Sequence, residues 1–418
     1  MQTLLSLSAL LVTILLMQIG TTALGPLDAL SALSLDFTST QIGVIGGSHF
    51  LGFLIGCLLS PALIRRVGHA RSYGVVVALS IIAVLLHPIF PNFYVWCVLR
   101  VMNGLAVASA YTAIESWLNA KLNASNRAQF FSFYRLFDMA GAIGAQSLII
   151  VLEPALYLSY SILALFLTLS LLPLGLTRTV PPELPENSVF SPAFAFTVSP
   201  LAVIGVLIVG ATGSAVRMIG PLFAYQLDFS VSEIGIFLML FMIGGMVVQL
   251  PVGILAGRIT TRQLLAFLSA TTILVSLGFR VIDSPEILGI KTPLILVFLF
   301  GATTMPLYSL CAIHANNLIK PAQMAALSAS LIFTFAVGAI LSPVLAGTLI
   351  EHFGPDSLFT YFACLHVILL CYTVYRSLRR PNIGRISRYF YIPRTSLFIA
   401  RTIKNIKRKK SVKTVRKA

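Results

Sequence analysis

Charged residues are scarce in this chain of 418 residues. Asp, Glu, Lys and Arg together occupy 10% of the positions, whereas hydrophobic residues occupy 57%. A typical soluble domain has about a quarter of its residues charged. The deficit of charge excludes a water-soluble globular fold.

Cysteine is also rare, with five residues, and their spacing matches neither a disulfide framework nor a zinc site. The sequence has no phosphate-binding loop, no metal-ligand spacing and no nucleophile motif. We therefore predict no cofactor, no metal, no catalytic residues and no enzymatic activity.

Apolar stretches recur from one end of the chain to the other, each near the ~20 residues that a helix needs to cross a bilayer. We predict an all-α membrane protein with twelve transmembrane helices. Six lie in the first half, at 4–27, 42–63, 73–90, 93–117, 130–152 and 156–176. Six lie in the second half, at 201–225, 234–255, 264–281, 294–315, 324–349 and 358–375.

The charges between these helices alternate in sign. Gaps after even-numbered helices contain Arg65, Arg66, Arg71, Lys121, Arg127, Arg178, Arg258, Arg262 and Lys320, opposed by Glu183 and Glu186. Gaps after odd-numbered helices contain Asp28, Asp36, Glu153, Asp228, Glu233, Asp283, Glu286, Glu351 and Asp356, opposed by Lys291. Because basic residues of short loops stay in the cytoplasm, this pattern predicts a plasma or inner membrane protein with both termini cytoplasmic.

The two halves of the chain repeat one another. Residues 35–43 match residues 227–235 at an offset of 192, and the Gly-Pro-Leu at 25–27 matches the one at 220–222. The repeat predicts two pseudo-symmetric six-helix halves, at 1–176 and 201–375, joined by a Pro-rich cytoplasmic linker at 177–200. Two such halves typically bind a solute at their interface and rock about it, so the repeat favours transport.

The loop after the second helix resembles a motif of the major facilitator superfamily, Gly-x-Leu-Ala-Asp-Arg-x-Gly-Arg-Lys. Arg66 and Gly68 match it, and Arg65 stands where the family has Asp. A second copy begins at Gly253 and keeps Arg258, again without the Asp. The resemblance implies that these five residues belong to gating loops.

Helix four carries Arg100 and Gly104, which resemble the family's Arg-x-x-x-Gly signature. In the family this Arg is associated with proton coupling. The segments Glu115-Ser116-Trp117-Leu118-Asn119 and Leu307-Tyr308-Ser309-Leu310 resemble the YcaD-like branch. The resemblance implies an MFS-like fold and secondary transport.

Charged residues inside a transmembrane helix are candidates for function because burying them is costly. Arg100 is the first candidate, for coupling or for holding an anionic group, and Arg217 is a second cavity candidate. Arg135 and Asp138, three residues apart on one helix, either neutralise each other or serve the cavity.

Two further positions, Glu115 and Asn103, are weaker candidates, and two others, Arg280 and Asp28, are not expected to serve the cavity. Glu115 lies near the cytoplasmic end, where a structural bond to a loop or to Arg135 competes with substrate contact. Asn103 is polar but uncharged, and such residues more often bond a neighbouring helix. Arg280 can extend to the interface, and Asp28 is predicted to lie at a solvated helix end.

The net charge of +16 is concentrated at the C-terminal end. Residues 376–418 contain fifteen Lys or Arg and no acid, which leaves 14 basic against 13 acidic residues, a net +1, for the remainder. We predict a basic cytoplasmic tail that lies on the anionic inner leaflet or is disordered, and we expect no nucleic acid partner.

Together these features favour a secondary active transporter that moves a small solute by alternating access, coupled to protons. The alternative is a receptor or scaffold that keeps the transporter fold without transporting.

Overall fold

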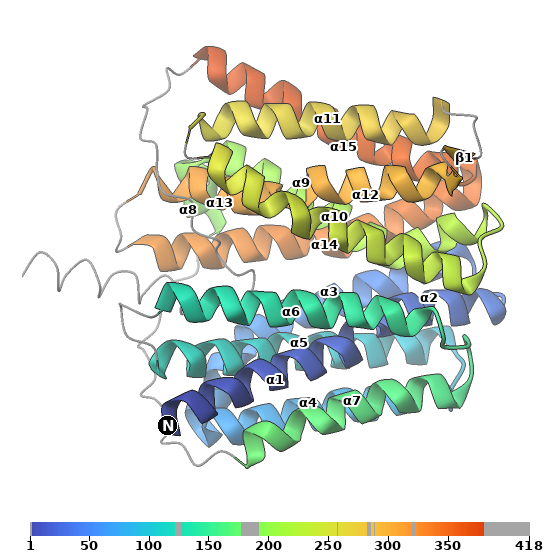
Figure 1. Cartoon of the computed structure of the whole chain (residues 1–418), viewed down its shortest axis with the longest axis vertical. Coiled ribbons are helices and arrows are strands. Elements are labelled where there is room, and N and C mark those ends of the chain that lie inside the picture. The colour runs from blue at the N-terminus through green and yellow to red at the C-terminus, as the bar shows by residue number, and fades with distance from the viewer. Residues whose placement is uncertain are drawn as a thin grey trace, which may run out of the picture.

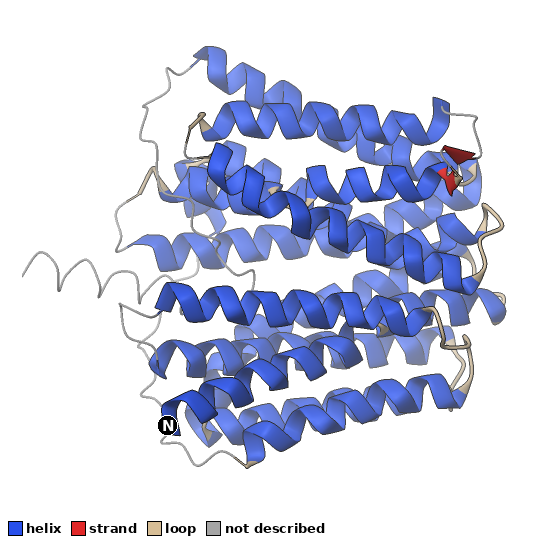
Figure 2. Cartoon of the chain, in the orientation of Figure 1, coloured by secondary structure: helices blue, strands red, loops and turns tan. Residues whose placement is uncertain are grey.

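The computed structural model describes residues 2–121, 127–176, 192–256, 258–281, 286–287, 289–319 and 323–379, which are helical almost throughout (Figure 2). The first half contains α1 (Gln2–Thr22), α2 (Leu24–Ser34), α3 (Ser39–Val67), α4 (His69–Leu86), α5 (Phe93–Lys121), α6 (Arg127–Ile149) and α7 (Tyr157–Gly175). The second half contains α8 (Pro192–Val198), α9 (Pro200–Tyr225), α10 (Val231–Leu255), α11 (Thr261–Val281), α12 (Thr292–Thr304), α13 (Leu307–Asn316), α14 (Met324–Phe353) and α15 (Asp356–Arg379). A short antiparallel hairpin, β1 (Glu286–Ile287) and β2 (Ile290–Lys291), precedes α12.

These helices account for the twelve predicted spans. Among the described residues, eleven spans are long and apolar enough to cross a membrane. The twelfth is α6, which has 23 residues and carries Arg135 and Asp138. Two spans consist of a pair of helices, α1 with α2 and α12 with α13.

Both broken spans have a proline close to the break. Pro26 and Pro306 lack an N–H, so the carbonyl four residues earlier has no helical partner, and a helix tends to break there. The chain interrupts the helix at Ala23 in the first half and at Met305 and Pro306 in the second.

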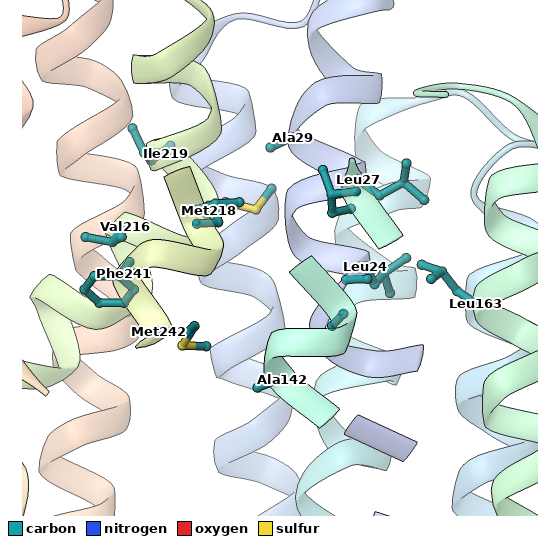
Figure 3. Close-up of a cluster of buried hydrophobic side chains, with 14 of the residues drawn as sticks. Leu24, Leu27, Ala29, Ala142, Leu163, Val216, Met218, Ile219, Phe241 and Met242 are labelled. Carbon is teal, nitrogen blue, oxygen red and sulfur yellow. The ribbon is translucent and has the colours of Figure 1, made fainter. Parts of the chain in front are cut away.

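The two sequence halves occupy separate parts of the bundle (Figure 1), with the blue-to-green helices below and most of the yellow-to-red helices above. They meet where α3 packs against α14, α6 against α10, and α2 against α9. One apolar cluster crosses this boundary, and its members labelled in Figure 3 include Leu24 and Leu27 of α2 and Met218 and Ile219 of α9.

The repeat seen in the sequence is also a structural repeat. α3 and α10 each begin with a capping box, formed by Thr38 with Gln41 and by Ser230 with Glu233. The aspartate two residues before each cap has a left-handed φ, 58° in the first half and 57° in the second. Equivalent local sequence therefore starts equivalent helices in the same way.

Several direct contacts between the halves lie near the ends of helices that the loop charges assign to the outer side. Gly43 and Gly47 of α3 lie directly against the backbone of α14 at Pro343 and Ile340, where a Cβ would clash. On the other flank, the Ser232 hydroxyl at the start of α10 donates to the carbonyl of residue 150, 2.9 Å away. Small residues permit this close approach.

A carboxylate adds a further contact between the two halves at this same end of the helices. The Thr40 N–H in the first turn of α3 donates to Oε2 of Glu351, in the last turn of α14, over 2.8 Å. The hydroxyls of Thr40 and Thr348 are 3.2 Å apart. An anion at a helix N-terminus is favourable, so Glu351 joins the two halves at this end.

Two predicted domain boundaries need correction. The linker was expected to continue to residue 200, but α8 and the first residue of α9 already occupy its last part, because Pro192 and Pro200 favour the first turn of a helix. The last span was expected to end at 375, but α15 continues to Arg379. Residues 177–191 and the tail from 380 onward lie outside the described residues.

Candidate functional site

A cavity of about 170 Å³ lies between the two halves. The first half lines it from α1, α2, α3, α5 and α6, and the second half lines it from α9, α10, α14 and Met305. Both helix breaks contribute, through Gly25 and Pro26 on one side and Met305 on the other. Irregular backbone at membrane depth is tolerated where it lines a cavity, which fits both positions.

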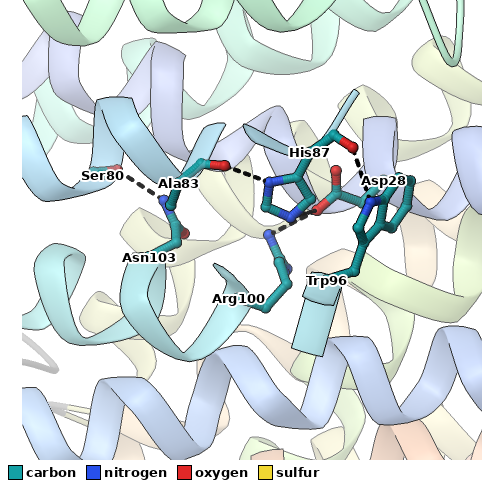
Figure 4. Close-up of polar contacts among 7 residues, drawn as sticks. All are labelled: Asp28, Ser80, Ala83, His87, Trp96, Arg100 and Asn103. Atoms are coloured by element: carbon teal, nitrogen blue, oxygen red, sulfur yellow. Dashed lines mark hydrogen bonds and ion pairs between the residues drawn. The ribbon is translucent and has the colours of Figure 1, made fainter. Parts of the chain in front are cut away.

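Five of the six predicted site residues line this cavity. They are Arg100, Glu115, Arg135, Asp138 and Arg217. Asn103 does not lie among the lining residues, and its amide donates to the Ser80 hydroxyl of α4 over 2.8 Å (Figure 4). Asn103 therefore bonds a neighbouring helix.

Arg135 and Asp138 form an ion pair along α6. The Tyr111 hydroxyl of α5 lies 3.0 Å from Oδ1 of Asp138 and 2.5 Å from Oε1 of Gln18 on α1, and its single proton serves one of them at a time. The pair is thus neutralised and also lines the cavity, and a role of either residue in the cavity stays a prediction.

Glu115 is buried, with 1% of its surface exposed. The Tyr134 hydroxyl of α6 donates to its Oε1 over 3.3 Å. The sequence pointed to a loop or to Arg135 as the partner, whereas the structure adds the tyrosine next to Arg135. Both residues of this bond line the cavity.

Asp28 corrects the sequence-based expectation of a solvated position. It is fully buried, because α2 continues to Ser34 and the ends of α4 and α5 cover it. Its Oδ2 lies 3.5 Å from Nη1 of Arg100 and 3.3 Å from Nε2 of His87 (Figure 4). Asp28 and Arg100 therefore form a buried ion pair just behind the cavity wall.

His87 is the residue that the sequence analysis missed. Its Nδ1 donates to the Ala83 carbonyl over 2.7 Å, and its own carbonyl accepts from Nε1 of Trp96 over 3.0 Å. The Tyr160 ring stacks on it at 5.9 Å between centroids. The sequence did contain one signal for this residue. His87 lies near the C-terminal end of the third predicted span, at a depth similar to that of Asp28.

The bonding of His87 determines where a proton must lie. A carbonyl oxygen only accepts, so Nδ1 carries a hydrogen, and the neutral ring then presents Nε2 as an acceptor. Asp28 faces this nitrogen with a carboxylate oxygen, and two acceptors repel each other. A proton shared between Asp28 and His87 would convert this contact into a hydrogen bond.

Arg100 itself has little free surface, with 4% exposed. Gly25 lies beside its guanidinium, and a Cβ at that position would lie 3.6 Å from Nη2. Arg100 thus touches the buried acid on one side and the cavity on the other.

The remaining predicted positions lie away from the cavity. Arg65 and Arg66 are exposed in the last turn of α3, and Gly68 follows with a left-handed φ of 82°. Gly253 lies in α10, and Arg258 is exposed after it. Their role in gating stays a prediction.

The described residues contain no group of three or more His, Cys, Asp or Glu side chains that could hold a metal ion. The five cysteines are all free thiols.

The fold has twelve spans in two related halves around a cavity that both charged and apolar side chains line, which is the architecture of membrane transporters built from repeated six-helix halves. The sequence profile of the Major Facilitator Superfamily matches residues 10–329 and also 204–412. The chain belongs to the Major Facilitator Superfamily.

Its relatives include the uncharacterized MFS-type transporter Ent638_1421 of Enterobacter sp. (strain 638), which is 25% identical over 378 residues, 89% of this chain and 96% of that protein. The uncharacterized MFS-type transporter YcaD of Escherichia fergusonii is 24% identical over 332 residues, 79% of this chain and 85% of that protein. The nucleoside transporter NupG shares the fold, with a TM-score of 0.75 at 16% identity over 90% of this chain and 98% of that one. The chain is thus a multi-pass membrane transporter of the YcaD-like branch.

Proposed function

We propose that this chain is a proton-coupled secondary transporter that moves a small solute through the cavity between its halves by alternating access. The observation that carries the proposal is the buried contact of Asp28 with His87 and Arg100. Ionisable groups inside a membrane bundle are expensive and mark ion or proton paths.

The proton step follows from the hydrogen bonding of the pair. With one proton shared between Asp28 and His87, the pair is neutral and leaves the charge of Arg100 available to the cavity. When the proton leaves, the pair becomes an anion that attracts Arg100 away from a solute. Proton binding and solute binding are coupled in this way through one guanidinium.

The contacts between the halves support an inward-facing state for this structure. Thr40 with Glu351, and Gly43 with Pro343, hold the outer ends of α3 and α14 together. With both termini in the cytoplasm, the cavity would exchange with the cytoplasm here and with the outside after the halves rock. The plasma or inner membrane, with the basic tail against anionic lipid, is the matching location.

No observation on the described residues favours a receptor or scaffold, and the relatives carry the name of transporters. The two functions differ in one measurement. Proteoliposomes loaded with a pH-sensitive dye should show proton movement when a transported solute is added, and Arg100→Ala should abolish it. Arg280→Ala, which changes an exposed arginine away from the cavity, should behave as the unmodified protein.

The outer contact gives a test of alternating access that is independent of coupling. Cysteines introduced at Thr40 and Thr348 should form a cross-link that stops transport and is reversed by reductant. Full transport by the cross-linked protein would contradict rocking of the halves.

A further inference from the structure

Cationic side chains from the two halves line the same cavity. Arg100 on α5, Arg217 on α9 and the His49 ring of α3 all belong to its wall. Arg217 is the contribution of the second half. A ligand in this cavity contacts both halves at once.

The charges that line the cavity do not cancel. Three arginines, Arg100, Arg135 and Arg217, oppose two carboxylates, Glu115 and Asp138. Asp28 lies behind Arg100, where His87, Arg100 and Tyr160 face it from α4, α5 and α7. With a proton shared between Asp28 and His87, the site carries one net positive charge, and without that proton the net charge is zero.

The wall also has an apolar and adaptable part. It includes Met139, Met218, Met242, Met305, Phe50 and Phe53. Thioether side chains adapt to differently shaped apolar groups and make favourable contacts with aromatic rings. For scale, an apolar protein cavity of about 150 Å³ binds benzene.

We propose that the solute is a small organic monoanion with an apolar or aromatic body, and that it binds together with the proton held by Asp28 and His87. The anionic group lies between Arg100 and Arg217, and the body lies against the methionines. This inference rests on the proposed function for transport of the ligand, but its binding can be tested without transport.

The test uses the purified full-length protein in detergent and measures thermal unfolding, because a ligand that binds the folded state raises its stability. The probes are shape-matched sets: benzoate, benzamide and benzylammonium, and hexanoate with hexanamide. We expect at least one of the two anions to stabilise the protein at concentrations on the order of 10 mM, and the neutral and cationic partners to fail.

Arg217→Gln should weaken binding of the active anion by about tenfold or more, since a charge-assisted hydrogen bond is lost. Arg217→Lys, which keeps the charge, should recover part of the affinity. Arg280→Gln is the matched control and should bind as the unmodified protein does. Unfolding without ligand, measured for each variant, separates loss of binding from loss of folding.

The coupled proton gives a second readout. Affinity for the anion should fall as the pH rises from about 6 to about 9 in the unmodified protein, and Asp28→Asn should make it independent of pH. Equal stabilisation by the neutral or cationic partners, no stabilisation by either anion, or affinity unchanged in Arg217→Gln would each overturn the proposal. Anion binding without proton-coupled uptake in proteoliposomes would keep the ligand class and refute the proposed function.

Discussion

The two halves share their backbone plan but fill one equivalent position with opposite chemistry. Asp28 follows Gly25 and Pro26 in the first half as Phe223 follows Gly220 and Pro221 in the second. Asp28 meets a buried histidine and arginine, whereas Phe223 lies in a cluster of phenylalanine rings.

The surroundings of Phe223 mirror those of Asp28. Its ring centroid lies 5.7 Å from that of Phe279, near the C-terminal end of α11, and 4.9 Å from that of Phe359, at the start of α15. His87 and Tyr160 hold the corresponding places near the end of α4 and the start of α7. The repeat therefore preserves the scaffold, and the first half alone carries an ionisable centre at this position.

Arg100→Ala should have the largest effect. It leaves Asp28 buried without its cation, which typically costs about 3 to 5 kcal/mol, and it removes coupling. Thermal unfolding and dye-monitored proton movement report the two losses, with Arg280→Ala as control. If the variant unfolded at the same temperature as the unmodified protein and kept its coupling, the Asp28–Arg100 pair would have no role in stability or coupling.

Replacing both residues of the Asp28–Arg100 pair should separate the effect on stability from the effect on transport. Asp28→Leu together with Arg100→Met converts the polar centre into an apolar one like that around Phe223. Apolar replacement of a buried ion pair is often neutral or stabilising, so we expect a stability within about 1 kcal/mol of the unmodified protein. Proton-coupled transport should remain absent, and its return would contradict the asymmetry of the halves.

Phe223→Ala tests the second half. Loss of a buried aromatic ring costs about 3 kcal/mol through the cavity it leaves. Coupling per folded molecule, measured at a temperature well below unfolding, should be retained. Phe267→Ala, which removes a largely exposed ring of α11, is the control and should change stability little. If Phe223→Ala abolished coupling, then coupling would depend on the Phe223 cluster as well as on the Asp28 group.

The helix caps should give the smallest effect and the same one in both halves. Thr38→Ala and Ser230→Ala each remove a side chain that accepts a backbone N–H at the start of α3 or α10. The expected cost is about 1 kcal/mol for each, read from thermal unfolding. A large difference between the two variants would show that the repeat is not energetically equivalent.

The sequence predicted the part of the site that depends on rare residue types. Arg100, Glu115, Arg135, Asp138 and Arg217 stand out because charge inside a membrane span is unusual, and all five line the cavity. It misplaced Asp28, because the sequence does not show whether a residue at a predicted helix end is exposed to solvent or covered by neighbouring helices. It gave Asn103 no firm role, because a polar amide bonds a helix or a ligand equally well.

The amino-acid order by itself determined the twelve spans, their division into two halves and the caps that start equivalent helices, since these follow from hydropathy and local hydrogen bonding. The tertiary structure alone decided that Asp28, His87 and Arg100 meet, and that Arg217 of the other half lines the same cavity as Arg100. These residues lie on different helices, and their distances depend on how the helices pack. The buried proton site and the charge of the cavity therefore arise only when the bundle is assembled.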